Sequence, residues 1–269
     1  MLDPARDDAP PAPRLTAADR AFFAEHGWVV VRGLIPPVAT AALEAAFDLV
    51  LPPAAYVVWG DRLVEIAGIS RYSPALDAQV RDPALAAVAG ELLDAASVQL
   101  LQDTALVKPT TGAARLAWHQ DYSYLTYLDR PAVVTARIAL TPCTVASGCL
   151  RVVDGSHRWG LHGDDLTFRT DAVADTRGAL PPELLARMAA DERTVELAPG
   201  DVSFHGCLTF HGSDENTSDQ PRKTLAVRYL DGGCRLLPDR LPSPELRAIF
   251  TTDDDGHLTG PSFPVLWRR

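Results

Sequence analysis

Long hydrophobic runs are absent from this sequence of 269 residues. A membrane-spanning helix needs about 20 consecutive apolar residues, and no stretch of the chain approaches that length. The N-terminus also lacks the basic segment and apolar core that mark a secretory signal. We therefore expect a cytoplasmic protein that has no membrane partner.

Cysteine is scarce as well. No two cysteines have C-x-x-C spacing, which argues against a zinc cluster or a dithiol redox motif. A free cysteine behaves as a small hydrophobe and is among the most buried residue types. We expect four buried and unpaired thiols in a reducing compartment: Cys143, Cys149, Cys207 and Cys234.

Basic residues are few relative to acidic ones: 25 Lys and Arg stand against 35 Asp and Glu, a formal net charge of −10. An acidic surface repels phosphate backbones, so no nucleic-acid partner is expected. With 47% hydrophobic and 22% charged residues, the composition is that of a globular protein. Residues 1–14, rich in Pro, Ala and Asp, predict a mobile tail, and residues 15–269 predict a single domain.

Helix signals dominate the first third of the chain. Thr16 stands three residues before Asp19, a capping-box pattern that begins a helix. Pro36-Pro37 and Asp82-Pro83 carry the cap and first-turn signals of two further helices. Helices are predicted over residues 16–26, 36–50, 82–94 and 181–191, while residues 54–72 are ambiguous between short strands and loop.

Short β-branched runs, separated by Gly, Pro, Asp and Asn turns, then predict strands. A helical front followed by many short strands favours a mainly β fold with flanking helices, an antiparallel sandwich or barrel with the helices packed outside. Strands are predicted over residues 28–31, 97–108, 132–141, 150–153, 193–197, 202–208 and 224–230.

A histidine and an aspartate stand two residues apart at His119 and Asp121. On extended backbone, residues two apart point to the same face. An imidazole beside a carboxylate is two-thirds of the triad that holds non-heme Fe(II) and leaves coordination positions open. The spacing alone does not decide, because short motifs recur by chance and His162-Gly163-Asp164 repeats it.

A triad needs a second imidazole from another strand, and His211 is the candidate. It follows the turn signal at residues 199–201 and an apolar run that predicts a buried strand. His205 competes for the same role, since it stands six residues earlier and is expected on the same strand face. If it is not a ligand, it is a histidine that supports the site or packs in the core.

Arg222 stands eleven residues after His211, beyond a polar loop, and opens the last predicted strand. A hairpin across that loop would return Arg222 to the side of the metal ligand. A guanidinium there could bind a carboxylate with two hydrogen bonds. Such an anchor suits a 2-oxo acid on the metal and is not required at a hydrolytic zinc site.

Three segments resemble the phytanoyl-CoA dioxygenase family of Fe(II)- and 2-oxoglutarate-dependent oxygenases. They are WHQDYSY around His119, SGCLRVVDGSH over residues 147–157, and GDVSFHGCLTFHGSDENTSDQPRKTLAVRYL over residues 200–230. The opening LTAADRAFFAEHGWVVVRGLI is also similar, so the resemblance covers most of residues 15–230. It implies a double-stranded β-helix, a jelly roll of the cupin type.

The resemblance also implies roles for individual residues. His119, Asp121 and His211 would bind Fe(II), and Arg222 would hold 2-oxoglutarate, with O2 as the second co-substrate. Ser213 matches a family position that hydrogen-bonds the same carboxylate. Lys108 matches a lysine of related sequences, and it either lines the mouth of the pocket or ends a strand. Related halogenases carry a small residue in place of the aspartate, so the retained Asp121 disfavours halogenation.

Substrate contacts are the least constrained prediction. Arg137 interrupts an apolar strand, and a buried arginine needs an anion, so it either binds an acidic group of the substrate or points to solvent. The aromatic residues near the ligand pair either line the substrate cavity or belong to the core. Those proposed as substrate contacts are Trp118, Tyr122 and Tyr124.

The expected function is hydroxylation of an unactivated C–H bond in a small molecule, a bacterial secondary-metabolism or amino-acid tailoring step. Epimerisation, desaturation and cyclisation begin with the same hydrogen abstraction and stay open. A jelly-roll binding protein without catalytic activity is the second alternative, although it would not need Arg222. Specificity resides in pocket walls that the sequence does not reveal, and the oligomeric state is equally unreadable.

Overall fold

The structure, a computed structural model, describes residues 15–50, 57–59, 63–110, 115–162, 180–241 and 244–269. The helices are α1 Ala17–His26, α2 Pro37–Val50, α3 Pro74–Val80, α4 Pro83–Leu93, α5 Pro182–Ala190 and α6 Pro244–Ile249. The strands are β1 Trp28–Val31, β2 Val57–Trp59, β3 Leu63–Ala67, β4 Ser97–Lys108, β5 Leu116–His119, β6 Val133–Ala139, β7 Leu150–Val153, β8 Glu192–Val195, β9 Val202–Gly206, β10 His211–Ser213, β11 Arg222–Asp231, β12 Thr251–Thr252, β13 Leu258–Thr259 and β14 Val265–Arg268.

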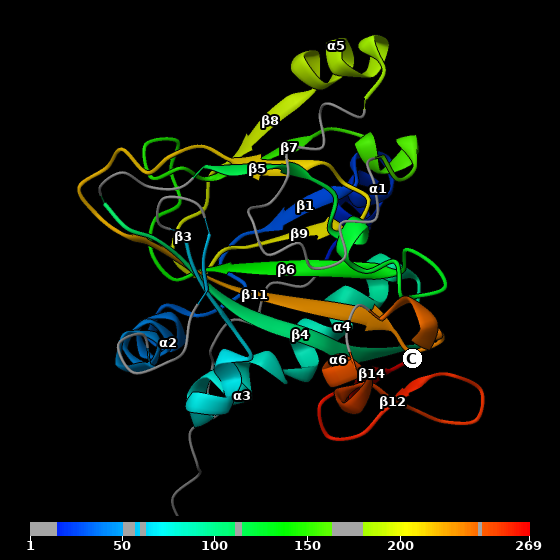
Figure 1. The fold of residues 1–269 in the computed structure, drawn as a ribbon. Helices are drawn as coiled ribbons and strands as arrows, with labels where there is room; N and C mark the ends of the chain where they lie inside the picture. The colour runs from blue at the N-terminus through cyan, green and yellow to red at the C-terminus, as the bar shows by residue number, and fades with distance from the viewer. Residues whose placement is uncertain (1–14, 51–56, 60–62, 111–114, 163–179, 242–243) are drawn as a thin grey trace, which may run out of the picture.

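Two antiparallel sheets face each other and form the barrel. The large sheet has the order β1-β9-β6-β11-β4-β3-β2, with β14 paired to β4, and the small sheet has the order β5-β10-β7-β8. In Figure 1 the small sheet lies above the large one, and consecutive strands repeatedly pass from one sheet to the other. This is the jelly-roll architecture that the sequence predicted.

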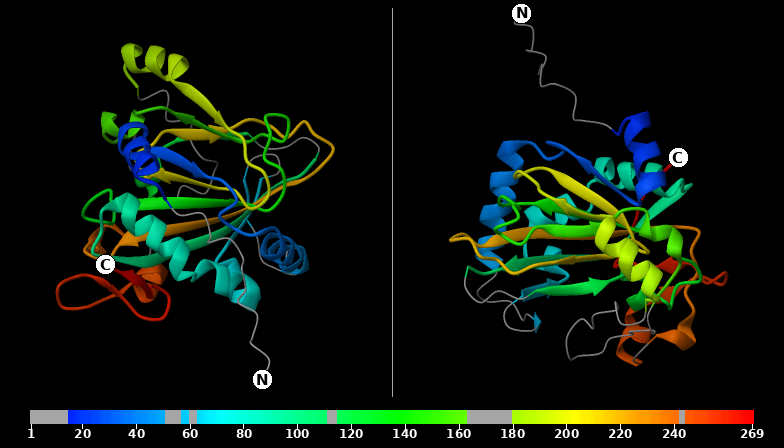
Figure 2. Two further views of the ribbon diagram at one scale, coloured as in Figure 1. Left: turned by 180° about the vertical axis from the view of Figure 1, so that it is seen from behind. Right: turned by 90° about the horizontal axis from the view of Figure 1, so that it is seen from above.

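Both faces of the large sheet are buried, but they differ in chemistry. One face is apolar and packs against α2, α3 and α4, which cover it from behind in Figure 2. The other face points into the barrel and carries polar side chains. Along β6, for example, Val134 and Ala136 belong to the helix-packed core, while Thr135 and Arg137 alternate with them. The polar residues of these strands therefore lie inside the molecule and do not face solvent.

Most predicted elements are confirmed to within a few residues. The capping box of Thr16 and Asp19 is present, and Gly27 ends α1 in the left-handed conformation (φ +81°) that glycine tolerates. Gly200 (φ +88°) forms the turn before β9, where a Cβ would lie 2.4 Å from the Ile35 carbonyl. Helices α3 and α6 and the C-terminal strands β12, β13 and β14 were not predicted. The predicted tail at residues 1–14 lies outside the described residues.

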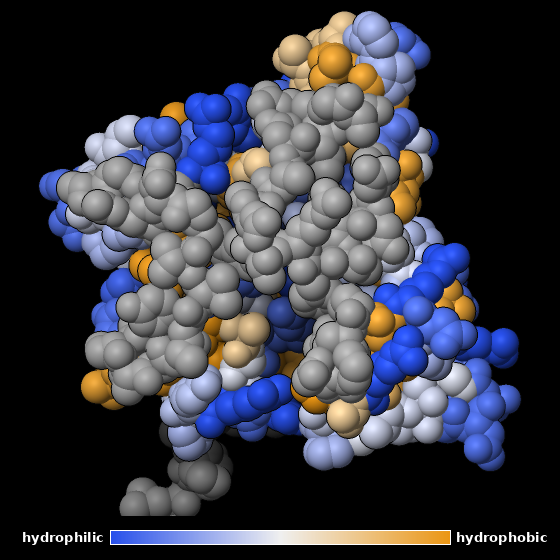
Figure 3. All heavy atoms as spheres, viewed as in Figure 1, coloured by the Kyte–Doolittle hydropathy of each residue, from blue (hydrophilic) through white to orange (hydrophobic). Residues whose placement is uncertain are grey.

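All four cysteines are buried and free, as expected. Helices within the described ranges are all too short or too polar to cross a membrane. On the face shown in Figure 3, hydrophobic side chains of the described residues are scattered among hydrophilic ones.

Candidate active site

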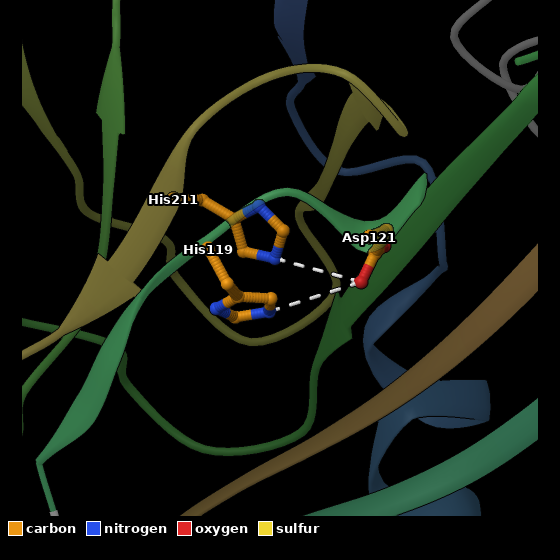
Figure 4. Close-up of side chains that lie close together, drawn as sticks. All are labelled: His119, Asp121 and His211. Atoms are coloured by element: carbon orange, nitrogen blue, oxygen red, sulfur yellow. Dashed lines mark ion pairs between the residues drawn. The ribbon is translucent and has the colours of Figure 1, made fainter. Parts of the chain in front are cut away.

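Three side chains with metal-binding atoms meet inside the barrel. The ligand atoms of His119, Asp121 and His211 all lie within 4.8 Å of one another, and all three residues are buried. Figure 4 shows both imidazole rings pointing toward the Asp121 carboxylate. His119 and His211 are directly opposite in the β5–β10 pair, so strand register fixes their separation. The predicted convergence of these residues is confirmed.

The backbone sets the protonation of both imidazoles. His119 Nδ1 lies 2.8 Å from the Ala117 carbonyl, and His211 Nδ1 lies 2.9 Å from the Thr209 carbonyl. A carbonyl only accepts, so each Nδ1 carries the proton and each Nε2 presents a lone pair. Burial lowers the pKa of both rings, and for His211 the neighbouring His119 and His205 lower it further. The rings are therefore neutral, the state that binds a metal.

Asp121 begins a 3-10 turn, Asp121–Tyr124, immediately after β5 and the extended residue Gln120. Its Oδ1 lies 3.9 Å from His119 Nε2 and 3.8 Å from His211 Nε2. Burial acts to raise the pKa of Asp121, but the Arg228 guanidinium and the nearby imidazoles outweigh it and hold the pKa well below its usual value. The carboxylate is thus ionised and ready to accept a cation.

His205 does not share a strand with His211, contrary to the sequence prediction. Strand β9 ends at Gly206, and the chain crosses to the small sheet before β10 begins. The two histidines face each other across the barrel, with ring centroids 4.4 Å apart. His205 Nε2 lies 3.5 Å from Asp121 Oδ2, the oxygen turned away from the other imidazoles. It therefore stands beside the triad and is not part of the ligand group.

The predicted hairpin between His211 and Arg222 is wrong. Strand β10 pairs with β5 and β7 in the small sheet, whereas β11 pairs with β4 and β6 in the large sheet. The polar loop between them is a crossover between sheets. Arg222 nevertheless reaches the interior, with 1% of its surface exposed, because β11 turns the residues of that parity inward.

Lys108, Arg137 and Arg222 form a buried group, here named the cation cluster. Lys108 is directly opposite Arg222 in the β4–β11 pair. Burial, with Arg222 and Arg137 beside it, lowers the pKa of Lys108 to about 6, and burial with Arg222 lowers the pKa of Arg137 to about 9. None of the three forms an ion pair with a carboxylate of the described chain. Such a cluster suits a bound anion.

The hydrogen bonds of the cation cluster go to neutral groups. Lys108 Nζ donates to the Asp214 carbonyl, Arg222 to the Gly148 carbonyl, and Arg137 to Thr224 Oγ1 at 3.3 Å. Arg222 Nε has no partner among the described residues, nor has the buried hydroxyl of Ser213 on β10. Buried polar atoms normally find partners, so this end of the barrel fits a ligand with carboxylate oxygens.

A cavity of about 160 Å³ opens onto His119 and Asp121. Its walls combine leucines with polar side chains from β3, β4, β11 and the turn after β5. Two of its hydroxyls, those of Thr104 and Tyr124, are buried without a partner in the described chain. Burial and the Asp121 charge raise the pKa of Tyr124 to about 12. The polar residues that line the cavity are Glu65, Gln102, Thr104, Tyr124, Tyr127 and Arg228.

The predicted aromatic contacts separate into two groups. Tyr124 lines the cavity and packs edge-on against His119, with ring centroids 5.9 Å apart. Trp118 belongs to an apolar cluster with Val153 and Phe210 on the opposite face of β5, because adjacent strand residues alternate. Tyr122 packs away from the cavity and donates to the Leu128 carbonyl at 3.0 Å. The structure does not place these two in the cavity wall.

Other residues of the interior were not predicted. Arg228 and Thr135 both hydrogen-bond Asp121. Arg228 interrupts an apolar strand, as Arg137 does. It stands six residues after Arg222, so both side chains are expected on the same face of the strand, and this spacing could have been read from the sequence. Of the competing pair, the His162 ring hydrogen-bonds the Trp159 carbonyl and its backbone N–H donates to Gln120, while Gly163 and Asp164 lie outside the described residues.

Comparisons with known proteins agree with this geometry. The chain is 27% identical over 235 residues to ectoine dioxygenase of Bordetella parapertussis, covering 81% of this chain and 76% of the relative. The structure resembles the α-ketoglutarate-dependent carbocyclase SnoK of nogalamycin biosynthesis, with a TM-score of 0.76, 26% identity and coverage of 94% and 97%. It also resembles the epimerase SnoN of the same biosynthesis, with a TM-score of 0.75, 25% identity and coverage of 93% and 98%.

The fold and the triad define a non-heme iron oxygenase that depends on Fe(II), 2-oxoglutarate and O2. More specifically, the chain belongs to the phytanoyl-CoA dioxygenase family, whose model matches residues 23–224.

Proposed function

We propose that this enzyme oxidises a C–H bond of a small molecule, with His119, Asp121 and His211 as the Fe(II) ligands. The observation that carries the proposal is the meeting of two neutral imidazoles and one ionised carboxylate within 4.8 Å. Three such ligands on one side of Fe(II) leave positions open for a 2-oxo acid and O2.

The cation cluster is the proposed site of 2-oxoglutarate. Arg222 and Lys108 would hold the carboxylate far from the metal, and Ser213 would donate its unpartnered hydroxyl. On the inward face of β6, Arg137 stands two residues from Thr135, which hydrogen-bonds Asp121. It also donates to Thr224, which stands two residues from Arg222 on β11. The cluster supplies positive charge without internal carboxylates, which supports binding of a dicarboxylate.

The chain positions the reactants and transfers no proton. Bound Fe(II), with 2-oxoglutarate and O2, supplies the oxidant for hydrogen abstraction from carbon, while 2-oxoglutarate is converted to succinate and CO2. The backbone carbonyls of Ala117 and Thr209 orient the two imidazoles. The leucine-lined cavity holds one C–H bond near the metal and excludes water.

Hydroxylation is the proposed outcome, and the substrate is proposed to be an amino acid or natural-product scaffold that fits the cavity of about 160 Å³. The similarity to a carbocyclase and an epimerase favours ring formation or epimerisation as a second candidate. Mass spectrometry separates them: hydroxylation adds one oxygen atom, ring formation removes two hydrogen atoms, and epimerisation leaves the mass unchanged. The four free cysteines support a cytoplasmic location.

The test has an anaerobic and an aerobic part. Fe(II) with 2-oxoglutarate should give a weak visible charge-transfer band in the wild-type protein. A panel of candidate substrates is then screened for stimulated succinate release. Alanine variants of His119, Asp121 and His211 should lose the band and reduce succinate formation to background, whereas His162→Ala should keep both. Full activity in any triad variant contradicts the assignment, and absence of the wild-type band favours a non-catalytic binding protein.

A further inference from the structure

One side of Asp121 faces a row of four residues that crosses the large sheet. In strand register, Gln102 on β4 is opposite Arg228 on β11, Arg228 is opposite Thr135 on β6, and Thr135 is opposite His205 on β9. We name this row the Asp121 cradle. Asp121 itself belongs to the turn after β5, so the carboxylate follows the small sheet in sequence but is held by the large one.

The cradle contacts both carboxylate oxygens. Thr135 Oγ1 donates to Asp121 Oδ2 at 2.8 Å, and His205 Nε2 lies 3.5 Å from the same oxygen. Arg228 donates through its terminal nitrogen to Oδ1 at 2.9 Å, with its Nε 3.5 Å from Oδ2. Oδ1 is the oxygen that faces the two ligand imidazoles. The contacts therefore fix which oxygen is turned toward the metal position.

Arg228 is itself held in place. Its other terminal nitrogen donates to Gln102 Oε1 at 2.9 Å. The β4–β11 register shifts between Arg228 and Tyr229, where Leu101 is passed over in the pairing. Such irregularities redirect side chains and are frequent beside active sites. The extra residue lies on β4, between Leu100 in the helix-side core and Gln102 in the cavity wall. On β11 the alternation is regular, so Tyr229 packs in the helix-side core while Arg228 faces the cavity.

We propose that Arg228 is a positioning residue, which, with Thr135, holds Asp121 so that a single oxygen meets the metal. The inference rests on the proposed function, because it assumes that Asp121 is a metal ligand. The guanidinium contributes orientation as well as charge: it reaches both oxygens of Asp121 while anchored to Gln102, a geometry that lysine cannot reproduce. Partners that orient metal ligands typically change metal affinity 10–100-fold when removed.

The test measures the Fe(II) dissociation constant anaerobically by chelator competition, together with the charge-transfer band in the presence of 2-oxoglutarate. Arg228→Met should raise the dissociation constant roughly 10–100-fold and shift or weaken the band. Arg228→Lys should recover only part of the affinity. The isosteric Thr135→Val should raise the constant a few-fold. The affinity for 2-oxoglutarate at saturating Fe(II) should change by less than about twofold in each variant, by the same reasoning.

Arg130→Met provides the matched control, because Arg130 pairs with Asp231 at the surface and lies outside the cradle. Melting temperatures identify variants that have lost their fold, and Thr135→Val keeps the test valid if Arg228→Met does not fold. Unchanged or tighter Fe(II) binding in folded Arg228→Met and Thr135→Val proteins would overturn the inference while leaving the proposed function intact. If the wild-type protein binds no Fe(II), both the inference and the proposed function are wrong.

Discussion

The triad and the cation cluster treat buried charge in opposite ways. At the triad, the Asp121 carboxylate meets a guanidinium, a hydroxyl and three neutral imidazoles, so its charge is compensated by the protein. At the cation cluster, each of the three basic side chains donates to a neutral acceptor. Arg222 and Arg137 lower the pKa of Lys108, and Arg222 lowers the pKa of Arg137. Isolated buried charges are costly. The protein itself therefore keeps Asp121 ionised for a cation, whereas the cation cluster has no internal counter-charge among the described residues and would be stabilised by a bound anion. The difference predicts where each reactant binds.

Arg222→Met should give the largest effect that separates the two regions. Loss of a charge-assisted pair costs about 1.5–3 kcal/mol, so the KM for 2-oxoglutarate should rise roughly 100-fold. Fe(II) affinity, measured without 2-oxoglutarate, should stay within about twofold, because Arg222 contacts none of the triad. For Arg222→Lys, the KM for 2-oxoglutarate should lie between the values of the wild type and of Arg222→Met. Equal losses of both affinities would show that the regions are not independent.

Arg137→Met decides to which ligand Arg137 belongs. Arg137 does not line the cavity beside His119 and Asp121, and Arg222 is the charged group with the largest effect on its pKa. We expect the KM for 2-oxoglutarate to rise about tenfold, as for loss of one hydrogen bond to a charged group. A substrate pair with and without a carboxylate supplies the control. If Arg137→Met loses activity only with the carboxylate-bearing substrate, Arg137 binds the substrate and not 2-oxoglutarate.

Lys108 should make stability depend on pH when 2-oxoglutarate is absent. Its pKa falls from 10.5 to about 6 on folding, so between these values the unfolded chain binds more protons and stability rises with pH. The slope from this one group is at most about 1.4 kcal/mol per pH unit. Denaturant midpoints at pH 6.5, 7.25 and 8.0 should show a steeper slope for the wild type than for Lys108→Met.

Addition of 2-oxoglutarate should flatten that slope, because a bound carboxylate restores the proton to Lys108. Identical slopes for the two proteins would mean that Lys108 keeps its charge in the folded protein. In that case the positive charge of the cation cluster is already compensated by the protein, as the charge of Asp121 is, and the two regions do not differ in this respect.

Tyr124→Phe and Tyr122→Phe should give the smallest effects. The Tyr124 hydroxyl has no partner in the described chain, so its removal should leave the melting temperature unchanged or slightly higher but alter the KM for substrate. Tyr122→Phe removes a hydrogen bond to the Leu128 carbonyl and should cost about 1 kcal/mol of stability with the KM for substrate unchanged. Thermal denaturation and substrate kinetics check both variants. An altered KM in Tyr122→Phe with a stability loss in Tyr124→Phe would mean that Tyr122, and not Tyr124, contacts the substrate.

Much of the fold was predictable because its signals are local. Thr16 with Asp19 predicts the start of α1, and the apolar, β-branched run over residues 97–108 predicts β4. The three proposed metal ligands and Arg222 were also predictable as candidates, since their types and spacing match a known family. Strand partners were not predictable, because a crossover and a hairpin leave the same turn signals in sequence. The misplaced hairpin before Arg222 is an example.

The sequence alone predicted the helices α1, α2, α4 and α5, the strands β1, β4, β6, β7, β8, β9 and β11, and the identity of the residues that can bind a metal. Only the tertiary structure decided which way the polar face of each strand points. Polar alternation ordinarily indicates a solvent-facing side, but here the second sheet closes over it, so that Arg137 is buried and Arg228 lines the internal cavity. The same closure brings Thr135 of β6 and His205 of β9 close to the Asp121 carboxylate. Their roles depend on register between strands far apart in the chain, which no local pattern encodes.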